Sequence, residues 1–300
     1  MTLKSFVELA FVGAGLPRLA RAAHRRDALV LAYHNVVPDG ERLLGDRSLH
    51  LPRRAFAGHL DALARSHDIV PLDDIEQPAA GARPRAAITF DDAYRGALTV
   101  GLEELARRGL PSTVFVAPGI LGDQTLWWDA LAGSGAGGLD PALRERALTE
   151  CRGRGDAVLE LASRLGRSTV AVPPWARTAT EAELGSAVQA GMRVASHSWS
   201  HANLAALAGD ELAHEMDAPA SWLTQRFAAA YVPYLAYPYG LTSPEAESAA
   251  GRAGYRRAFR VSGGYLRSAA NEPLACPRLN VPAGISRAGF VLKAAGIRAT

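Results

Sequence analysis

Short apolar runs alternate along this chain with longer stretches whose apolar residues recur at helical spacing. The runs at residues 28 to 32, 86 to 88 and 113 to 116 predict buried strands. Residues 53 to 67 and 209 to 228 have the length and pattern of amphipathic helices. Strands that alternate with helices in this way are typical of an α/β fold with parallel strands.

Polar residues that can do chemistry follow several of the apolar runs, at the point where each strand ends. Asp91 and Asp92 end one run, His34 ends another, and His197 follows the apolar stretch at 192 to 195. The carboxyl ends of parallel strands gather on one face of a sheet with helical crossovers. We therefore expect these side chains to share one site.

The adjacent carboxylates of Asp91 and Asp92 are costly at the end of a buried strand. An ionised carboxylate out of water needs a partner, a metal or a proton. Side chains alternate along an extended segment, so the two carboxylates are expected to point in different directions and serve as metal ligand and general base. The alternative is a helix N-cap, because Asp is favoured there and a helical stretch follows from Tyr94.

His197 and His201 lie four residues apart and form the second motif. Neutral imidazole is the commonest side-chain metal ligand near neutral pH. Two histidines and one carboxylate make a three-ligand set that leaves coordination positions open for water and substrate. The spacing alone is weak evidence in a chain with eight histidines, but its place after an apolar run matches that of the Asp pair.

A third motif, at residues 235 to 240, ends in Pro238, Tyr239 and Gly240 after another apolar run. Proline removes an amide donor and stiffens the chain, while glycine permits a tight turn. On its own this segment is read as an ordinary turn.

These motifs, in this order, resemble those of the NodB-like polysaccharide deacetylases, carbohydrate esterase family four. The resemblance rests on TFDD at 89 to 92, H-S-x-x-H at 197 to 201 and P-Y-G at 238 to 240, and it covers residues 28 to 282. It implies a distorted (β/α) barrel with one divalent metal, most often Zn²⁺. It also implies roles for individual residues: metal ligands Asp92, His197 and His201, catalytic base Asp91, and an oxyanion-stabilising backbone amide at Tyr239.

Residues around these motifs are predicted to contact the glycan. Tyr237, Pro238 and Gly240 belong to the third motif, and Trp199 lies between the two histidines. For Trp199 a second interpretation stays open, in which the indole braces its loop.

The chain departs from the family pattern at two places. Many members carry Arg where this chain has Ala236, and that Arg orients the catalytic Asp. Many also carry an acid His near the C-terminus, whereas here no His follows His214. The Tyr-His-Asn-Val sequence around His34 resembles the permuted branch that deacetylates poly-N-acetylglucosamine and similar exopolysaccharides. His34 is then the predicted acid, and Arg278 on the last strand is predicted to bind Asp91 as a bidentate fork.

The predicted function is removal of N-acetyl groups from amino sugars of a polysaccharide or oligosaccharide. Two alternatives stay open, an esterase that removes O-acetyl groups and a carbohydrate-binding barrel without turnover. The complete set of predicted ligands argues against the binding protein, which does not need them.

The formal net charge of +3 is located entirely in residues 1 to 27, which hold five basic and two acidic side chains. The remaining chain is neutral, which argues against a nucleic-acid surface. The first 27 residues mix cations with apolar residues, which predicts a basic amphipathic helix that lies on a membrane surface or packs against the barrel. A cytoplasmic or membrane-peripheral location is favoured over secretion.

Residues 28 to 300 are predicted to form the catalytic domain, interrupted by a helical insertion at about 119 to 178. A glycine-rich stretch at 133 to 138 falls within it, followed by helices near 140 to 151 and 154 to 166. Trp127 and Trp128 open this insertion, and core packing is favoured for them over sugar stacking. The two cysteines do not make a disulfide framework and are expected to be buried.

Overall fold

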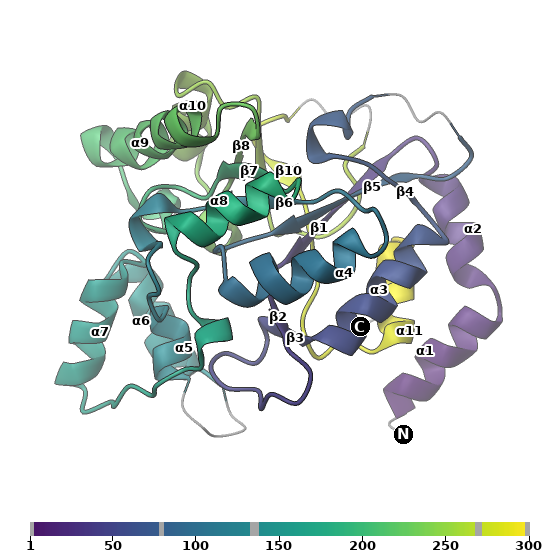
Figure 1. Ribbon diagram of the computed structural model, residues 1–300, viewed down its shortest axis with the longest axis horizontal. Helices are drawn as coiled ribbons and strands as arrows, with labels where there is room; N and C mark the ends of the chain where they lie inside the picture. Colours follow the sequence, from purple (N-terminus) through teal and green to yellow (C-terminus); the bar gives the residue numbers. More distant parts are fainter. Residues whose placement is uncertain (1–2, 78–80, 133–137, 268–271, 298–300) are drawn as a thin grey trace.

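A nine-stranded sheet forms the centre of the protein, in a computed structural model that describes residues 3–77, 81–132, 138–267 and 272–297 (Figure 1). Every strand pair in it is parallel. The strands are β1 Ala28–Tyr33, β4 Asp68–Ile69, β5 Arg85–Phe90, β6 Thr113–Val116, β7 Arg193–Ser196, β8 Tyr231–Ala236, β9 Arg257–Arg260, β10 Cys276–Pro277 and β11 Leu279–Asn280. The barrel predicted from the sequence is thereby confirmed.

The sheet curls into a nearly closed barrel through one C-terminal segment. The strand order is β10-β9-β8-β7-β6-β5-β1-β11, with β4 beside β5. The strands at the two ends, β10 and β11, are consecutive in sequence and are separated only by Arg278. Residues 276 to 280 therefore join β9 on one side to β1 on the other, and Arg278 lies at the seam.

The strands are apolar throughout because both of their faces are covered. All six residues of β1 are buried, and they alternate between two cores. Leu29 and Leu31 pack in the core between the sheet and the outer helices. Val30 packs inside the barrel with Phe115 and Phe259. The period-two alternation of a strand thus fills both cores from one continuous apolar run.

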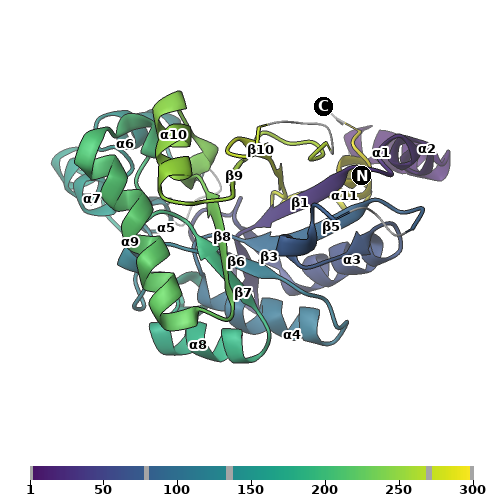
Figure 2. The same cartoon turned by 90° about the horizontal axis from the view of Figure 1, so that it is seen from above.

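Helices cover the outside of the barrel, and those predicted at residues 53 to 67 and 209 to 228 are among them (Figures 1 and 2). They are α3 Arg53–Ala64, α4 Leu102–Ala106, α8 Glu181–Gln189, α9 Gly209–Phe227, α10 Pro244–Arg252 and α11 Arg287–Ala294. A small parallel pair, β2 Asn35–Val37 and β3 His50–Pro52, lies beside them.

A helical stretch was predicted from Tyr94, and the chain is helical from residue 95 to Ala106. Its middle is a π-helix, Ala97–Gly101, which leads directly into α4. Asp92 and Ala93 lie just before it with positive φ angles of 69° and 51°, which no right-handed helix includes. The predicted helix is therefore confirmed, with a π-helical turn that the sequence did not indicate.

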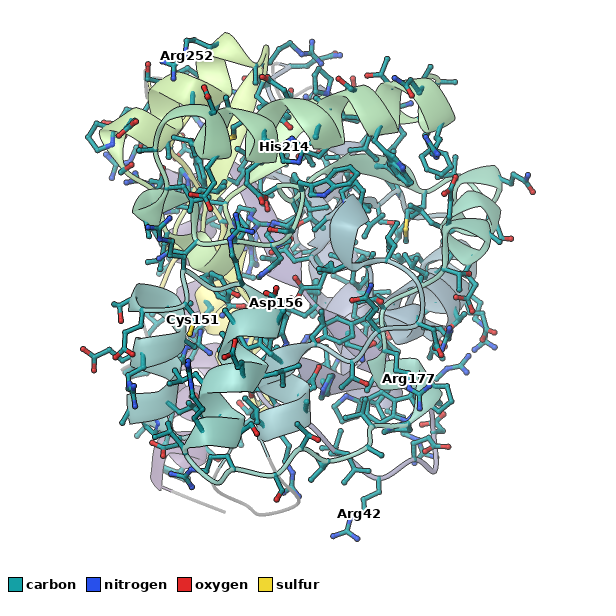
Figure 3. All side chains as sticks on the ribbon, turned by 90° about the vertical axis from the view of Figure 1, so that its left-hand side faces the viewer. Arg42, Cys151, Asp156, Arg177, His214 and Arg252 are labelled. Atoms are coloured by element: carbon teal, nitrogen blue, oxygen red, sulfur yellow. The ribbon has the colours of Figure 1, made fainter. Side chains whose placement is uncertain are left out.

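The insertion forms three helices at one end of the molecule, α5 Trp127–Leu131, α6 Pro141–Thr149 and α7 Gly155–Arg164. The predicted helices near 140 and 154 are confirmed, whereas most of the glycine-rich stretch, residues 133 to 137, lies outside the described residues. Cys151 and Cys276 are free and buried, as expected. In a side view Cys151 lies on the insertion, and His214 on α9 lies above it (Figure 3).

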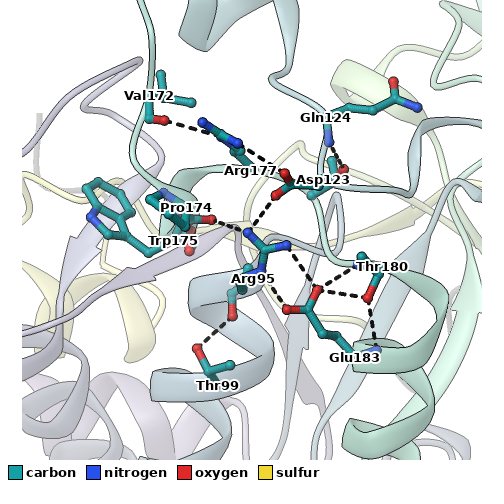
Figure 4. Close-up of polar contacts among 12 residues, drawn as sticks. Arg95, Thr99, Asp123, Gln124, Val172, Pro174, Trp175, Arg177, Thr180 and Glu183 are labelled. Atoms are coloured by element: carbon teal, nitrogen blue, oxygen red, sulfur yellow. Dashed lines mark hydrogen bonds and ion pairs between the residues drawn. The ribbon is translucent and has the colours of Figure 1, made fainter.

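Both ends of the insertion are fastened to the barrel by a cluster of charges around Arg95 (Figure 4). The Arg95 guanidinium binds Glu183 at 2.7 Å and Asp123 at 2.7 Å, and it donates to the Pro174 carbonyl oxygen. Asp123 also binds Arg177 at 3.0 Å. Because Arg95 lies only three residues after Asp92, this cluster ties the insertion to the strand end that carries the carboxylate pair.

The first residues form two helices, α1 Leu3–Gly13 and α2 Leu16–Ala23, instead of one amphipathic helix. Gly15, with φ of 77°, separates them. Helix α1 packs along α11, at the opposite end of the molecule from α6 and α7 (Figures 1 and 2). None of the described helices has the length and apolar character needed to cross a membrane.

Candidate metal and catalytic site

The predicted motifs meet at the carboxyl edge of the barrel. Asp91 and Asp92 follow β5, His197 and His201 follow β7, and His34 follows β1. They line one small cavity of about 150 Å³. The other lining residues come from neighbouring strand ends and loops: Ser48, Leu49, Trp128, Arg144, Tyr237, Tyr239, Gly240, Val261 and Asn280.

Asp92, His197 and His201 converge as the sequence predicted. Asp92 Oδ1 lies 3.0 Å from His201 Nε2 and 3.4 Å from His197 Nε2. One ligand atom from each residue lies within 4.8 Å of the others, and all three residues are buried. Among the described residues this is the one group of at least three His, Cys, Asp or Glu side chains with such geometry.

The three side chains fit a divalent cation. Asp92 Oδ1 is buried without a hydrogen-bond partner among the described residues, although both imidazoles are close to it. His197 Nδ1 lies 2.7 Å from the Ala236 carbonyl oxygen, which can only accept a hydrogen bond. Nδ1 therefore carries the proton, and Nε2 directs its lone pair toward Asp92, as in metal-binding histidines.

The His201 imidazole is held by packing against neighbouring aromatic rings and not by a hydrogen bond to its Nδ1. Its Nδ1 is buried and has no hydrogen-bond partner among the described residues. The ring centroids of Trp128, Tyr239 and His197 lie 4.9, 4.7 and 4.7 Å from that of His201. Packing on three sides therefore sets the direction of His201 Nε2.

The pKa values in this group follow its charges. Burial opposes ionisation of Asp92, but His201 and His197 outweigh it and hold the pKa of that carboxyl well below its ordinary value. Burial also lowers the pKa of His201. Burial acts in the same direction on His197, but Asp91 and Asp92 reverse the effect and raise the pKa of that imidazole.

The backbone is strained where the motifs lie. Of the seven non-glycine residues with positive φ in the described part of the chain, four belong to the three motifs, Asp92, Ser198, His201 and Tyr239, and a fifth, Ala93, directly follows the first motif. Such conformations cost about 1–3 kcal/mol each and persist only where the surrounding structure enforces them. Their concentration at one cavity marks it as the functional site.

Arg278 binds Asp91 in the geometry expected from the sequence. Its two terminal nitrogens each lie 2.7 Å from one Asp91 carboxylate oxygen. The guanidinium is fully buried, stacks 4.9 Å from the Phe115 ring and also donates to Thr89 Oγ1. Burial opposes ionisation of Asp91, but Arg278 outweighs it and holds the pKa of the Asp91 carboxyl below its ordinary value.

Of the remaining predicted site residues, some line the cavity and others do not. His34, Tyr237 and Gly240 line the cavity, whereas Pro238 is buried in the turn. Trp199 is absent from the described residues that line the cavity. Its indole packs on His214 at 5.9 Å, and its backbone amide donates to Glu215. The geometry therefore favours the interpretation in which Trp199 braces its loop.

The sequence did not single out Arg144, Ser48, Leu49, Val261 or Asn280. Arg144 reaches the cavity from the insertion, and no periodicity in the sequence indicates where an insertion folds back. Asn280 could have been found, because it ends the last strand as Asp91 ends β5.

Trp128 connects the site to a buried polar network behind it. Its Nε1 donates to Tyr94 Oη at 2.7 Å, and Tyr94 Oη donates to Asp129 Oδ2 at 2.6 Å. Asp129 Oδ1 also lies 2.9 Å from His50 Nε2. Asp129 belongs to the insertion and His50 to β3, so this network locks the insertion against the wall of the cavity. The predicted core packing of Trp127 and Trp128 is confirmed, but Trp128 also lines the cavity.

Comparison with known proteins agrees with this arrangement. The family model described as polysaccharide deacetylase matches residues 79–258, more than half of the chain. The chain belongs to the polysaccharide deacetylase family. The match covers β5 to β8 and the start of β9, and so includes the carboxylate pair, both histidines and the Pro-Tyr-Gly turn. No curated protein matches the chain significantly.

Solved structures of deacetylases share the fold. The Streptococcus pyogenes deacetylase PplD is 16% identical, with a TM-score of 0.61 over 89% of this chain and 97% of that one. IcaB from Ammonifex degensii is 17% identical, with a TM-score of 0.60 over 90% and 97%. A de-N-acetylase from Aggregatibacter actinomycetemcomitans is 15% identical, with a TM-score of 0.60 over 89% and 99%. At these identities the likeness concerns the fold alone.

Proposed function

We propose that this polysaccharide deacetylase is metal-dependent and removes N-acetyl groups from amino sugars of a polysaccharide or oligosaccharide. The observation that carries the proposal is the position of the Asp92–His197–His201 group beside the Arg278–Asp91 pair in one cavity. A metal-ligand set and a separately held carboxylate are the two parts that metal-assisted hydrolysis of an unactivated amide uses.

Asp91 acts as the general base. Arg278 occupies both of its oxygens from one side, which keeps the carboxylate ionised and fixes its direction. The pKa of Asp91 stays below its ordinary value, so Asp91 is ready to take a proton from water near neutral pH. A divalent cation such as Zn²⁺ would be held by Asp92, His197 and His201 and would supply Lewis acidity toward the carbonyl and the attacking water.

His34 acts as the general acid for the leaving amine. It lines the same cavity as Asp91. We expect His34→Ala to keep its metal and to lose about 10²–10⁴-fold in turnover, the usual contribution of general acid catalysis. Turnover near that of the wild type would mean that another group supplies the proton.

The Tyr239 backbone amide is assigned to the oxyanion. Its turn is rigid, because Tyr239 has a φ of 60° and its hydroxyl donates to the Gly153 carbonyl oxygen at 2.9 Å. Trp127 Nε1 donates to the same hydroxyl at 3.1 Å. A donor held in place before the reaction stabilises developing charge without reorganisation, and one such donor contributes about 3 kcal/mol.

The size of the cavity favours a small acyl group as the part of the substrate that enters. Its volume of about 150 Å³ equals roughly five waters of liquid volume. An acetamide group fits within it, while the sugar and the rest of the polymer remain outside, near Arg144 at the rim. Two fold relatives, the Streptococcus pyogenes deacetylase in complex with acetate and the de-N-acetylase, agree with this acyl group.

Ester hydrolysis is the second candidate, because the same base and the same cation would serve an O-acetyl ester. A direct test compares purified protein on N-acetylated amino-sugar oligomers and on O-acetylated glycans, with and without chelator. We expect acetate release from the N-acetylated series, loss of it with chelator and recovery with added Zn²⁺.

His201→Ala should abolish both acetate release and metal content. His214→Ala is the matched control, because His214 is exposed on α9 and lies outside the cluster. Acetate release only from O-acetylated glycans would replace the amidase assignment, and release unaffected by both chelator and His201→Ala would overturn the metal assignment.

A further inference from the structure

The N-terminal arm, residues 3 to 27, carries most of the large apolar side chains that are exposed in the described part of the chain. Of the eight large apolar side chains exposed in the described part of the chain, six lie between residues 6 and 19. They are Phe6, Val7, Leu9, Phe11, Leu16 and Leu19, with Leu19 70% and Phe6 59% exposed. Scattered exposed apolar residues are common, but such a concentration on one element marks an interaction surface.

Helix α1 is turned so that polar residues face the barrel. Glu8 is only 5% exposed, and it accepts a hydrogen bond from Ser286 Oγ at 2.6 Å. The fit is close, because a Cβ added at Gly289 would lie 2.9 Å from Glu8 Oε1. A helix on a water-facing surface normally buries its apolar face and exposes its polar one. Here the order is reversed, so the arm is docked by a buried carboxylate and leaves its apolar side outside.

Exposed cations accompany this apolar side. Lys4 lies near the start of the arm, Arg18 on α2, and Arg25 and Arg26 at its end. All four are exposed, and none forms an ion pair with another described residue. They belong to the segment that accounts for the whole net charge of the chain.

We propose that the N-terminal arm binds the surface of an anionic lipid bilayer, with its apolar side chains in the interface and its arginines at the headgroups. Apolar side chains mixed with unpaired cations match that interface, because acyl chains accept the former and anionic headgroups the latter. Two short helices of this kind lie on a bilayer and do not cross it. The inference is independent of the proposed reaction.

The arm places such a membrane beside the catalytic opening. Lys4 and Ser5 border a hollow with Pro282 and Ile285. This segment begins two residues after Asn280, which lines the catalytic cavity. From there the arm runs to the opposite end of the barrel, where β1 begins (Figures 1 and 2). The bilayer would therefore lie along one wall of the barrel, with the cavity near its edge.

Vesicle flotation with the full chain tests the proposal. Vesicles of phosphatidylcholine alone are compared with vesicles that also contain phosphatidylglycerol, at low and high salt. We expect binding to the anionic vesicles and loss of most of it at high salt, because salt screens the attraction. Equal binding to both vesicle types, or none to either, would overturn the proposal.

Two sets of substitutions separate the contribution of the cations to membrane binding from that of the apolar side chains. Arg18→Gln/Arg25→Gln/Arg26→Gln should weaken anionic binding by on the order of 100-fold, since each basic side chain contributes about fivefold. Phe6→Ser/Leu9→Ser/Leu19→Ser should lose binding even at low salt. These side chains are exposed, so the thermal midpoint and acetate release from soluble oligomers should stay unchanged, unlike after deletion of the arm, which would expose the α11 surface.

Matched controls lie elsewhere on the surface. Leu165→Ser removes an exposed apolar side chain of the insertion, and Arg42→Gln/Arg54→Gln/Arg164→Gln removes three exposed cations, of which Arg42 is seen in Figure 3. Both controls should bind as the wild type does; losses equal to those of the arm variants would overturn the assignment. A concentration-dependent dimer in solution, abolished by the apolar triple variant, would assign the surface to a second copy of the chain instead.

Discussion

At the scale of single residues, Arg278 compensates for the arginine that many family members carry at the position of Ala236. A lysine could not take the place of the arginine at either position, because only the planar guanidinium binds both carboxylate oxygens of Asp91. The sequence allowed this prediction because the last strand ends at the same barrel edge as β5. The structure places the two groups in contact at 2.7 Å.

We predict that Arg278→Lys lowers kcat by on the order of 10²-fold, the effect of a displaced catalytic group. Lysine keeps the charge, so metal content should not change. Steady-state kinetics on an N-acetylated oligomer, with metal analysis of the same sample, measures both. Arg278→Met should also reduce the free energy of unfolding by about 3–5 kcal/mol, because it leaves a buried carboxylate unpaired. Full activity of the Lys variant would show that the fork has no catalytic importance.

The candidate metal ligands were predictable because they follow two strand ends of one parallel sheet, Asp92 after β5 and both histidines after β7. Trp128 was singled out only as a core residue and Arg144 not at all, because both reach the cavity through the insertion, whose path depends on contacts distant in sequence. Asp129 with His50 and Arg95 with Glu183 are separated by 79 and 88 residues. Long-range pairs of this kind leave no periodic trace in the chain.

At the scale of elements, the apolar runs predicted where the strands lie, because a strand that is buried on both faces needs apolar residues at successive positions. The π-helical turn Ala97–Gly101 and the positive φ of Asp92 and Ala93 before it were missed. Local propensity does not report a conformation that the tertiary structure enforces.

Contact between the insertion and the Pro-Tyr-Gly turn gives a prediction for Gly153. Its φ is 73°, and a Cβ there would lie 2.6 Å from Tyr239 Cε2. We predict that Gly153→Ala destabilises the protein by about 1–3 kcal/mol and also lowers kcat, because the Tyr239 turn must shift.

Gly166→Ala is the matched control for Gly153→Ala. Its φ is 68°, but no atom lies within 4 Å of the added Cβ. Chemical denaturation and kinetics of both variants separate backbone strain from the clash. Equal kcat values in the two variants would refute the coupling between the insertion and the turn.

The packing of α3 on α11 gives a prediction for pH dependence. The ring of His59 stacks on that of Phe290 at 4.0 Å, and burial lowers its pKa to about 4. The unfolded state, with a pKa near 6.5, then binds more protons between pH 6.5 and 4. Stability is therefore full above pH 6.5 and falls by up to about 3 kcal/mol as the pH drops to 4.

Denaturant titrations across this pH range, on the wild type and on His59→Phe, measure the contribution of His59. The variant keeps a ring against Phe290 and cannot titrate, so its stability should fall less. Identical slopes for the two proteins would assign the pH dependence to other groups.

At the scale of the whole molecule, alternation of strands and helices predicted an α/β fold with parallel strands, the motifs predicted the family, and the barrel was implied by the family resemblance alone. Closure of the barrel was not predictable, because β10 and β11 have two residues each and carry no strand pattern of their own. They are held by ladders with β9 and β1 and by the buried fork of Arg278. One segment thus closes the sheet and positions the base.

The metal group also links distant parts of the molecule, since Asp92 follows β5 and both histidines follow β7. A cation bound there stabilises only the folded state, because unfolding separates ligands more than 100 residues apart in sequence. At free Zn²⁺ one hundred times the Kd, the gain is about 2.7 kcal/mol, which corresponds to a rise of roughly 5 °C in Tm for a chain of this size. Calorimetry with Zn²⁺ and with chelator should show this difference in the wild type and in His214→Ala, whereas in His201→Ala the two scans should coincide. A Zn²⁺-dependent shift that persists in His201→Ala would place the stabilising cation elsewhere.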